Sequence, residues 1–298
     1  MELRQLEYFI AVAGEMNFTR AAQRLHLVQS ALSTSVSKLE KELGVELFDR
    51  SKQQIEITPA GELFREHARQ VIHAARLAKD SMSSFQGQLS GMINFGSIVS
   101  FGAVEVPRIL GEFHRAYPLV RIRLRPNQGP LTTYLSALAD GSLDLGLLTA
   151  PDHFPATVQM KMLSEEPLLF VCRPDHPLAQ RARVDVAELA EEELIGFPPD
   201  FGIRRAVDNG FAAIGITPRT PYEVATGFGL ATSLVRHGLG SIFMPASETD
   251  CCPDLRAVPV HPAPAWTIYL AWAQRERLGP ASAKLAELLL ASAPHQQG

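Results

Sequence analysis

The 298-residue sequence predicts two parts of different fold class, an N-terminal all-α module and a C-terminal α/β domain. The first prediction rests on apolar residues that recur at helical spacing up to Phe85. The second rests on apolar strands that alternate with helices from Ile93 onward. The length of the chain also favours at least two domains.

Composition and charge are those of an ordinary globular protein. Hydrophobic residues make up 46%, charged residues 20%, and the net charge is -4, which excludes a strongly basic nucleic-acid coat but allows a local basic patch. No apolar run has membrane-spanning length, and the N-terminus lacks a signal-peptide pattern. We therefore expect a cytoplasmic protein without a membrane partner. Cys172, Cys251 and Cys252 form neither a disulfide framework nor a zinc-ligand spacing, so no metal or cofactor is expected.

Two helices are predicted at the N-terminus, separated by a break at Gly14–Asn17. The apolar stripe of the first consists of Leu3, Leu6, Phe9, Ile10 and Ala13. Asn17 or Thr19 can cap the second, whose inward residues are Ala21, Ala22 and Leu25.

A third helix, Val28–Leu43, is the segment around which the module is organised, and Gly44 ends it. Its apolar stripe consists of Val28, Leu32, Val36, Leu39 and Leu43. Its other faces carry mostly short polar residues: Gln29, Ser30, Ser33, Thr34, Ser37, Lys38 and Lys41. Such side chains suit a helix that another surface must approach closely, as the major groove of DNA does. The alternative is an ordinary amphipathic helix with a serine-rich exterior. The tight connection between the second and third helices favours a helix-turn-helix.

A small hairpin is predicted after this helix, with apolar pairs on either side of a polar tip, Ser51–Gln53. The hairpin would be the wing of a winged helix-turn-helix, and Arg50 and Lys52 could reach phosphates from it. Between Phe18 and Lys41, the basic residues Arg20, Arg24, Lys38 and Lys41 are opposed only by Glu40. We expect modest, salt-dependent affinity for DNA from this concentration of charge.

A long linker helix is predicted from Thr58-Pro59, with threonine as its cap and proline at its first position. It has an a/d seam of about three heptads at Phe64, Ala68, Val71, Ala75, Ala78, Met82 and Phe85. The seam favours a two-stranded coiled coil over a helix packed on its own domain. A dimer would present two recognition helices to a rough DNA palindrome.

The N-terminal module resembles the LysR-type transcriptional regulators. The resemblance is carried by LRQLEYFIAVAGEMNFTRAAQRLHLVQSALSTSVSKLEKELGVELFDR and ITPAGELF. It implies that Gln29, Ser30 and Ser33 approach base edges, and that Thr19, Lys38 and Arg50 hold the DNA backbone. Arg20, Thr34, Ser37 and Lys52 complete the predicted DNA surface. The resemblance also implies tetramers, formed through further contacts of the C-terminal domain.

The C-terminal domain begins with a βαβαβ pattern, which predicts a parallel sheet. Its strands are Ile93–Ile98, Val120–Leu124 and Leu143–Thr149, and its helices are Gly102–Ala116 and Leu131–Ala139. A second subdomain follows, with strands near Leu168–Cys172, Leu194–Phe197, Pro221–Val224 and Ser241–Met244, and helices at Ile203–Ala213 and Leu230–His237. The chain returns through Thr267–Trp272 and closes with a helix, Ser282–Ala291. Two lobes joined by two crossing strands are typical of a periplasmic-binding-protein-like fold.

The predicted domains are a winged helix-turn-helix at 1–58, a dimerising linker helix at 59–89 and an effector-binding domain at 90–298. Lobe I of that domain would comprise 90–163 and 266–298, and lobe II would comprise 164–265.

Small ligands bind such folds between the lobes, at strand C-termini and helix N-termini. This rule selects Ser100, Phe101, Gln128, Gly129, Phe201, Gly202, Thr226 and Phe228. Backbone N–H groups at the helix starts would suit a carboxylate, and the phenylalanines could pack an apolar body. The alternative is that Ser100 and Thr226 are plain N-caps and that the three phenylalanines belong to the core.

The sequence favours a DNA-binding transcriptional regulator that is not an enzyme. Its expected partners are promoter DNA, a small-molecule effector, further copies of itself and RNA polymerase. Asp175-His176-Pro177 and His153 have no nucleophile motif beside them, and no phosphate-binding loop motif occurs. The adjacent Cys251 and Cys252 are a weak basis for a redox switch. Two rival classes stay open, a transporter's solute receptor and an enzyme with an appended DNA-binding domain.

Overall fold

The computed structural model describes residues 1–51, 54–126, 131–149, 156–274 and 278–293. The chain divides into two compact units. Unit 1 comprises residues 1–88 with 140–142, and unit 2 comprises residues 89–139 with 143–298.

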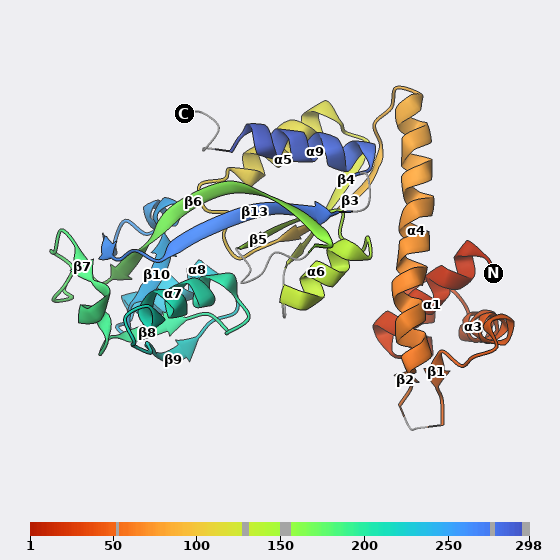
Figure 1. Ribbon diagram of the computed structural model, residues 1–298, viewed down its shortest axis with the longest axis horizontal. Coiled ribbons are helices and arrows are strands. Elements are labelled where there is room, and N and C mark those ends of the chain that lie inside the picture. Colours follow the sequence, from red (N-terminus) through yellow and green to blue (C-terminus); the bar gives the residue numbers. More distant parts are fainter. Residues whose placement is uncertain (52–53, 127–130, 150–155, 275–277, 294–298) are drawn as a thin grey trace. The chain divides into compact units, whose positions relative to one another are not determined.

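Unit 1 is a winged helix-turn-helix followed by a long helix, as predicted (Figure 1). Its elements are α1 (Leu3–Glu15), α2 (Phe18–Arg24), α3 (Gln29–Leu43), β1 (Phe48–Asp49), β2 (Glu56–Ile57) and α4 (Pro59–Phe85). Strands β1 and β2 pair antiparallel to form the wing.

The predicted helix ends of unit 1 are confirmed. The Asn17 side chain accepts a hydrogen bond from the Arg20 N–H at the start of α2. Thr58 does the same for the Gly61 N–H at the start of α4. Gly44 ends α3 with a φ of 71°, a conformation that favours glycine.

Aromatic and branched side chains form the core of unit 1. The Phe9 ring lies 5.3 Å from Phe48 and 5.1 Å from Phe64, between ring centroids. Leu32, Val36 and Leu39 of α3 are fully buried.

Three residues of the predicted apolar stripes are solvent-exposed instead. The exposed fractions are 42% for Leu3, 70% for Val28 and 36% for Leu43. All three lie at helix ends, where Val28 is the extended N-cap of α3. A helical stripe is covered only where a neighbouring element packs against it, so periodicity overestimated burial at these ends.

The predicted dimer seam on α4 is wrong in its first part. Phe64 packs edge-on against Phe9, and Ala68 is fully buried in the core of unit 1. The cause is that the N-terminal half of α4 lies against α1. Further along α4, Val71, Met82 and Phe85 are 45%, 62% and 89% exposed.

Unit 2 begins with the predicted parallel sheet. β3 (Gly91–Ser97) pairs parallel with both β4 (Val120–Pro126) and β5 (Leu145–Thr149). Two helices connect them, α5 (Val106–Ala116) and α6 (Leu131–Ala139). Helix α5 starts four residues later than predicted, because the Val104 N–H first closes a turn onto the Phe101 carbonyl.

Two long antiparallel strands, β6 (Val158–Cys172) and β13 (Ala265–Ala273), run side by side across unit 2 (Figure 1). They continue the β4-β3-β5 sheet and connect it to β10 (Ile242–Pro245). Helices α5 and α9 (Pro280–Ala291) cover one face of the sheet, and α6 covers the other. Apart from β10, which packs with β8 and α8 in the second lobe, these elements form the first lobe.

The second lobe lies at the far end of the two long strands (Figure 1). It contains β7 (Val184–Asp185), β8 (Glu193–Gly196), α7 (Gly202–Ala212), β9 (Arg219–Glu223), α8 (Phe228–Arg236), β11 (Arg256–Val258) and β12 (Val260–His261). Short 3-10 helices span Val186–Leu189 and Ala246–Cys251. The order of elements confirms the predicted two-lobed fold. No helix in the described ranges is long and apolar enough to cross a membrane.

Candidate DNA surface and interlobe pocket

The outer face of α3 is open to solvent and carries six of the predicted DNA-contacting residues. Gln29, Ser30, Thr34, Ser37 and Lys38 are exposed, and Ser33 is half-buried. Their spacing of three, four, seven and eight residues puts them on one broad face. The buried Leu32, Val36 and Leu39 hold the opposite face against unit 1.

Arg50 connects the wing to α3. Its guanidinium donates to Ser37 Oγ at 3.1 Å and to Glu40 Oε2 at 2.7 Å. It also lies 4.9 Å from the centroid of the Phe18 ring. Glu40 in turn accepts the N–H groups of Leu47 and Phe48 through its other oxygen. These bonds fix the start of the wing beside the recognition helix, and Glu40 offsets part of the Arg50 charge.

The distribution of positive charge differs from the prediction. Arg20 donates to the Glu15 carbonyl at 2.6 Å, and Arg24 donates to the Glu15 carboxylate at 2.9 Å. The prediction considered only the segment from Phe18 to Lys41, in which Glu40 is the one acidic residue. Glu15 precedes that segment, but the turn after α1 places it beside Arg20 and Arg24. Lys38 and Lys41 are exposed and form no ion pair within the described part of unit 1. Thr19 is exposed, and Lys52 lies outside the described residues.

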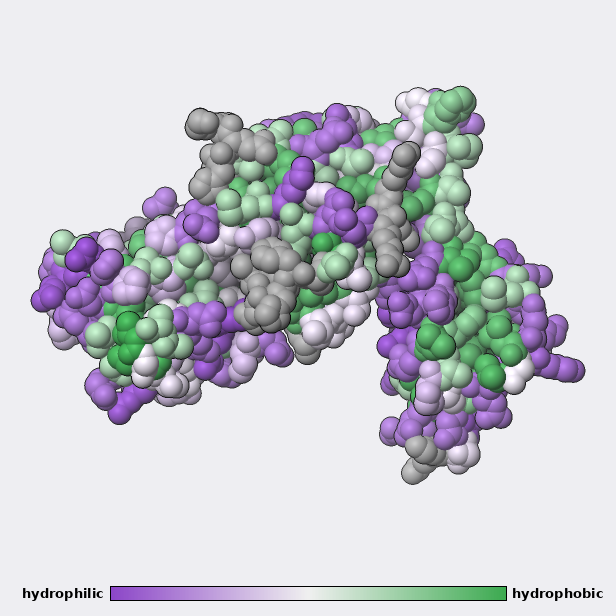
Figure 2. Space-filling view, viewed as in Figure 1, coloured by the Kyte–Doolittle hydropathy of each residue, from purple (hydrophilic) through white to green (hydrophobic). Residues whose placement is uncertain are grey.

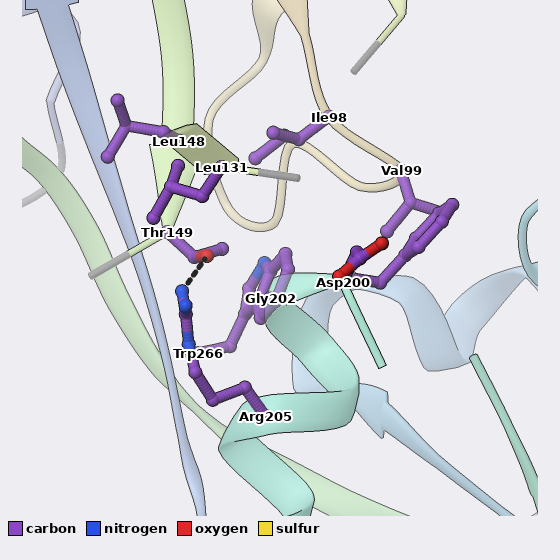
Figure 3. Close-up of a pocket in the computed structure, with 10 residues that line it drawn as sticks. Ile98, Val99, Leu131, Leu148, Thr149, Asp200, Gly202, Arg205 and Trp266 are labelled. Carbon is purple, nitrogen blue, oxygen red and sulfur yellow. Dashed lines mark hydrogen bonds between the residues drawn. The ribbon is translucent and has the colours of Figure 1, made fainter. Parts of the chain in front are cut away.

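A small pocket with a cavity volume of about 30 Å³ lies between the two lobes of unit 2 (Figure 3). We call it the interlobe pocket. Its lining residues come from both lobes and from β13: Ile98, Val99, Leu131, Leu148, Thr149, Asp200, Phe201, Gly202, Arg205 and Trp266. Of the residues predicted to contact an effector, Phe201 and Gly202 line it.

The start of α7 touches the end of β5 across this pocket. A Cβ atom placed on Gly202 would lie 1.8 Å from Thr149 Oγ1, so only glycine permits the approach. One turn further along α7, Arg205 Nη2 donates to the same Thr149 oxygen at 3.5 Å, a long hydrogen bond (Figure 3).

Two of the predicted effector residues are occupied by other contacts. Phe228 is buried in the second lobe, where its ring packs edge-on at 5.3 Å from Phe197. Ser100 is 3% exposed and donates to Glu248 Oε1 at 2.6 Å. Both residues were selected by their position after a strand, which does not show where their side chains point.

The remaining predicted positions are not part of the pocket lining. Phe101 is half-buried against the core, and Thr226 is exposed. Gln128 and Gly129 lie outside the described residues. The alternative of plain N-caps also fails, because Glu105 and Gly227 are the N-caps of α5 and α8.

A carboxylate link that the sequence did not indicate joins the lobes beside Ser100. Glu166 on β6 accepts the Ala103 N–H at 2.8 Å from the first lobe. It also accepts the Ser247 N–H at 2.7 Å and the Ser247 hydroxyl at 2.9 Å from the second lobe. Together with the Ser100–Glu248 bond, this group holds the β3–α5 loop to the Ala246–Cys251 segment.

The sequence analysis also missed Thr149, Arg205 and Trp266 as pocket residues. Thr149 ends a predicted parallel strand, and Arg205 lies in the first turn of a predicted helix, so the strand-end rule could have found both. Trp266 enters the pocket through the pairing of β13 with β6, which places it opposite Glu166. No local signal indicates that pairing.

The two buried cysteines are poor nucleophiles. Burial raises the pKa of the Cys172 thiol to about 11, and burial likewise raises the pKa of Cys252 to about 11. Both side chains therefore stay as thiols at neutral pH, whereas the thiolate is the reactive form.

The chain combines a winged helix-turn-helix, whose recognition helix is open, with a two-lobed fold that has a pocket between its lobes. This combination is typical of DNA-binding regulators. Family models agree with this class. The model for the bacterial regulatory helix-turn-helix protein, lysR family, matches residues 3–62. The model for the LysR substrate binding domain matches residues 86–294. The chain belongs to the LysR family of transcriptional regulators.

Relatives with full-length similarity carry regulator names. The chain is 33% identical to the transcriptional regulator ShiR of Corynebacterium glutamicum, over 82% of this chain and 86% of that one. It is 30% identical to BudR of Raoultella terrigena, over 93% of this chain and 96% of that one. A solved structure of full-length OxyR from Pseudomonas aeruginosa has a TM-score of 0.73 at 28% identity, over 98% and 97% of the chains. Full-length CbnR complexed with its target DNA has a TM-score of 0.67 at 26% identity, over 98% and 100%.

Proposed function

We propose that α3 enters the major groove of promoter DNA, with Gln29, Ser30, Ser33 and Thr34 toward base edges. The observation that carries this proposal is the open face of short polar side chains on a helix fixed to its domain by Leu32, Val36 and Leu39. Base edges in the major groove are read by such side chains through hydrogen bonds.

Phosphate contacts would come from residues around this face. Thr19, Arg20 and Lys38 are exposed beside the DNA surface, and Lys52 extends the predicted set. Ser37 and Arg50 would act through each other, because their mutual bond orients the wing. Contacts of this kind position the protein without reading sequence.

Dimers would form through the part of α4 from Val71 to its end. The apolar residues Val71, Met82 and Phe85 are exposed there, and Ala75 and Ala78 lie between them at heptad spacing. Figure 2 shows hydrophobic surface along α4. Exposed apolar residues in such a row mark an interaction site. Two copies would place two recognition helices on an inverted repeat, and contacts between effector domains would make tetramers.

A small molecule in the interlobe pocket would modulate promoter binding or bending. The pocket is lined from both lobes, so an occupant that prefers one lobe arrangement shifts the population toward it. We assign the effector-binding part to residues 90–298 and place the lobe boundaries near 163 and 266, as predicted. RNA polymerase would respond to the altered complex. The protein would act in the cytoplasm, and it would catalyse no reaction. The regulator names of the relatives support this proposal.

The DNA-binding proposal is tested by selecting DNA from a random pool with the full chain. The expected product is an inverted repeat with two half-sites. Ser33→Glu and Thr34→Glu should each abolish binding to the selected DNA, because a carboxylate would then face the DNA. Ser136→Glu, on the exposed side of α6, is the matched control and should bind normally. Unimpaired binding by both α3 variants would show that another surface reads the DNA.

A further inference from the structure

Val28, at the start of the recognition helix α3, is an apolar side chain that the fold leaves uncovered. It is 70% exposed, more than any other large apolar side chain described before α4. Its backbone is extended, with a φ of -75° and a ψ of 133°, and its carbonyl accepts the N–H groups of Ala31 and Leu32. Val28 is therefore fixed as the N-cap of α3 while its isopropyl group lies in solvent.

Valine is a poor residue for this position if only stability matters. An N-cap side chain normally accepts a hydrogen bond from an N–H group of the first turn, and valine has no acceptor. Asn17 and Thr58 cap α2 and α4 in this way, whereas Val28 gives α3 no such bond. Residues that break a local rule of this kind are expected where function requires them.

The neighbours of Val28 indicate what that function is. Val28 directly precedes Gln29 and Ser30, which are exposed and are the first residues of α3 proposed to approach base edges. In helix-turn-helix proteins, the N-terminal residues of the recognition helix contact the bases. A DNA duplex that takes Gln29 and Ser30 into its major groove therefore brings base edges to Val28 as well.

An apolar side chain can recognise one feature of the major groove. Among the bases, only thymine carries a methyl group there, at C5, whereas the other groups at the base edges are hydrogen-bond donors and acceptors. The branched valine side chain is stiff at χ1, so it loses little conformational freedom when a methyl group packs against it. Gln29, Ser30 and Ser33 present hydrogen-bonding groups, so Val28 adds a kind of contact that their polar ends do not make.

We propose that Val28 is a specificity-determining residue, which packs against the C5 methyl group of a thymine in each half-site of the promoter. The contact removes the methyl group and the isopropyl group from water, and it selects thymine at that position. Helix capping is thereby given up for base recognition at the start of α3. This inference rests on the proposed function, in which α3 enters the major groove.

The test replaces each thymine of the selected DNA in turn by deoxyuridine, which lacks only the C5 methyl group and keeps the base pair. Fluorescence anisotropy measures the affinity of the full chain for each duplex. At one thymine in each half-site, the replacement should weaken binding about fourfold, the effect of one methyl-sized group that is no longer buried. A 5-bromouracil base at the same position carries a substituent of similar size and should restore binding.

Two variants connect this effect to Val28. Val28→Ser removes the apolar group and supplies a capping hydroxyl, so the thermal unfolding temperature should not fall while the fourfold effect disappears. Val45→Ser is the matched control, because Val45 is 47% exposed but lies beyond the opposite end of α3, roughly 22 Å along the helix. This control should discriminate thymine from deoxyuridine as the unaltered chain does.

The outcomes separate this inference from the proposed function. A methyl effect that is equally large in Val28→Ser, or that is absent at every thymine, overturns the role of Val28 and leaves α3 as the DNA-reading helix. If Val28→Ser weakens binding to thymine and deoxyuridine DNA by the same factor, valine serves the fold, and the inference is again overturned. Failure of the full chain to select any DNA overturns the proposed function, and the inference with it.

Discussion

Thr149 Oγ1, at the end of β5, is the acceptor of a 3.5 Å hydrogen bond from Arg205 Nη2 on α7. The two residues belong to different lobes, and their approach depends on Gly202, which carries no side chain beside Thr149. A substitution at Gly202 or Thr149 should therefore change the distance between the two lobes.

Gly202→Ala should force the start of α7 away from β5. The added Cβ would lie 1.8 Å from Thr149 Oγ1, so side chain or helix must shift. We expect a loss of about 1–3 kcal/mol in the free energy of unfolding of unit 2, as for other overpacked sites. Chemical denaturation measures it. Gly111→Ala, on α5 with open space around it, is the control and should not destabilise. Unchanged stability of Gly202→Ala would contradict the close contact.

Glu166→Gln should loosen the link between the lobes. The carboxylate accepts three hydrogen bonds, and an amide offers only one acceptor oxygen. We expect unfolding to become easier by about 1–3 kcal/mol, the usual cost of unsatisfied polar groups. Hydrogen exchange should also quicken at Ala103 or at Ser247, because their N–H groups bond to different carboxylate oxygens and the amide keeps only one of these acceptors. Glu193→Gln, at an exposed position, is the control. Unaltered exchange at both amides would rule out the link.

Cys172 and Cys252 should resist alkylation at about pH 7.5, because their raised pKa leaves little thiolate. Exposed Cys251 should be labelled first, as mass spectrometry of briefly treated native protein can show. We accordingly expect no peroxide response through the two buried thiols. Rapid native labelling of Cys172 would contradict its burial.

The same two thiols predict the sign of a pH effect on stability. Their pKa is about 11 in the folded chain, above the value of about 8.5 expected when unfolded. The unfolded state therefore loses these protons first as pH rises. Stability should fall between about pH 8.5 and 11, and Cys172→Ala should reduce that slope. A slope that is unchanged would assign the pH effect to other groups.

Val71→Asp combined with Met82→Asp should break the proposed α4 contact, since both side chains are exposed on the apolar row of α4. The proposed tetramer should then fall apart into dimers held by the effector-domain contacts. A buried charge at a dimer seam has no partner and is strongly unfavourable. Sedimentation velocity reports the mass. Ser84→Asp, on the opposite side of the helix, is the control and should stay associated. A double variant that keeps its oligomeric state would place the interface elsewhere.

Local chemistry was predictable from the sequence. The caps at Asn17, Gly44 and Thr58 depend on residues within one helical turn, and the structure has all three. The parallel β3, β4 and β5 strands follow from alternation along the chain.

Long-range packing was not predictable in the same way. Phe64 satisfies a heptad pattern, yet it faces Phe9 because α1 lies beside α4. Phe228 follows a strand as a ligand residue would, yet it packs on Phe197. Trp266 reaches the pocket only through the register of β13 with β6. In each case the deciding neighbour is distant in sequence, so no local pattern contains the information.

The most direct test of a ligand-gated DNA-binding regulator is a footprint of the full chain on its selected DNA, with and without a saturating small molecule that calorimetry shows to bind the full chain. We predict two protected half-sites whose spacing, protected length or hypersensitive bands change when the small molecule is bound. An identical footprint at concentrations where calorimetry shows the pocket to be full would contradict the coupling of pocket and DNA.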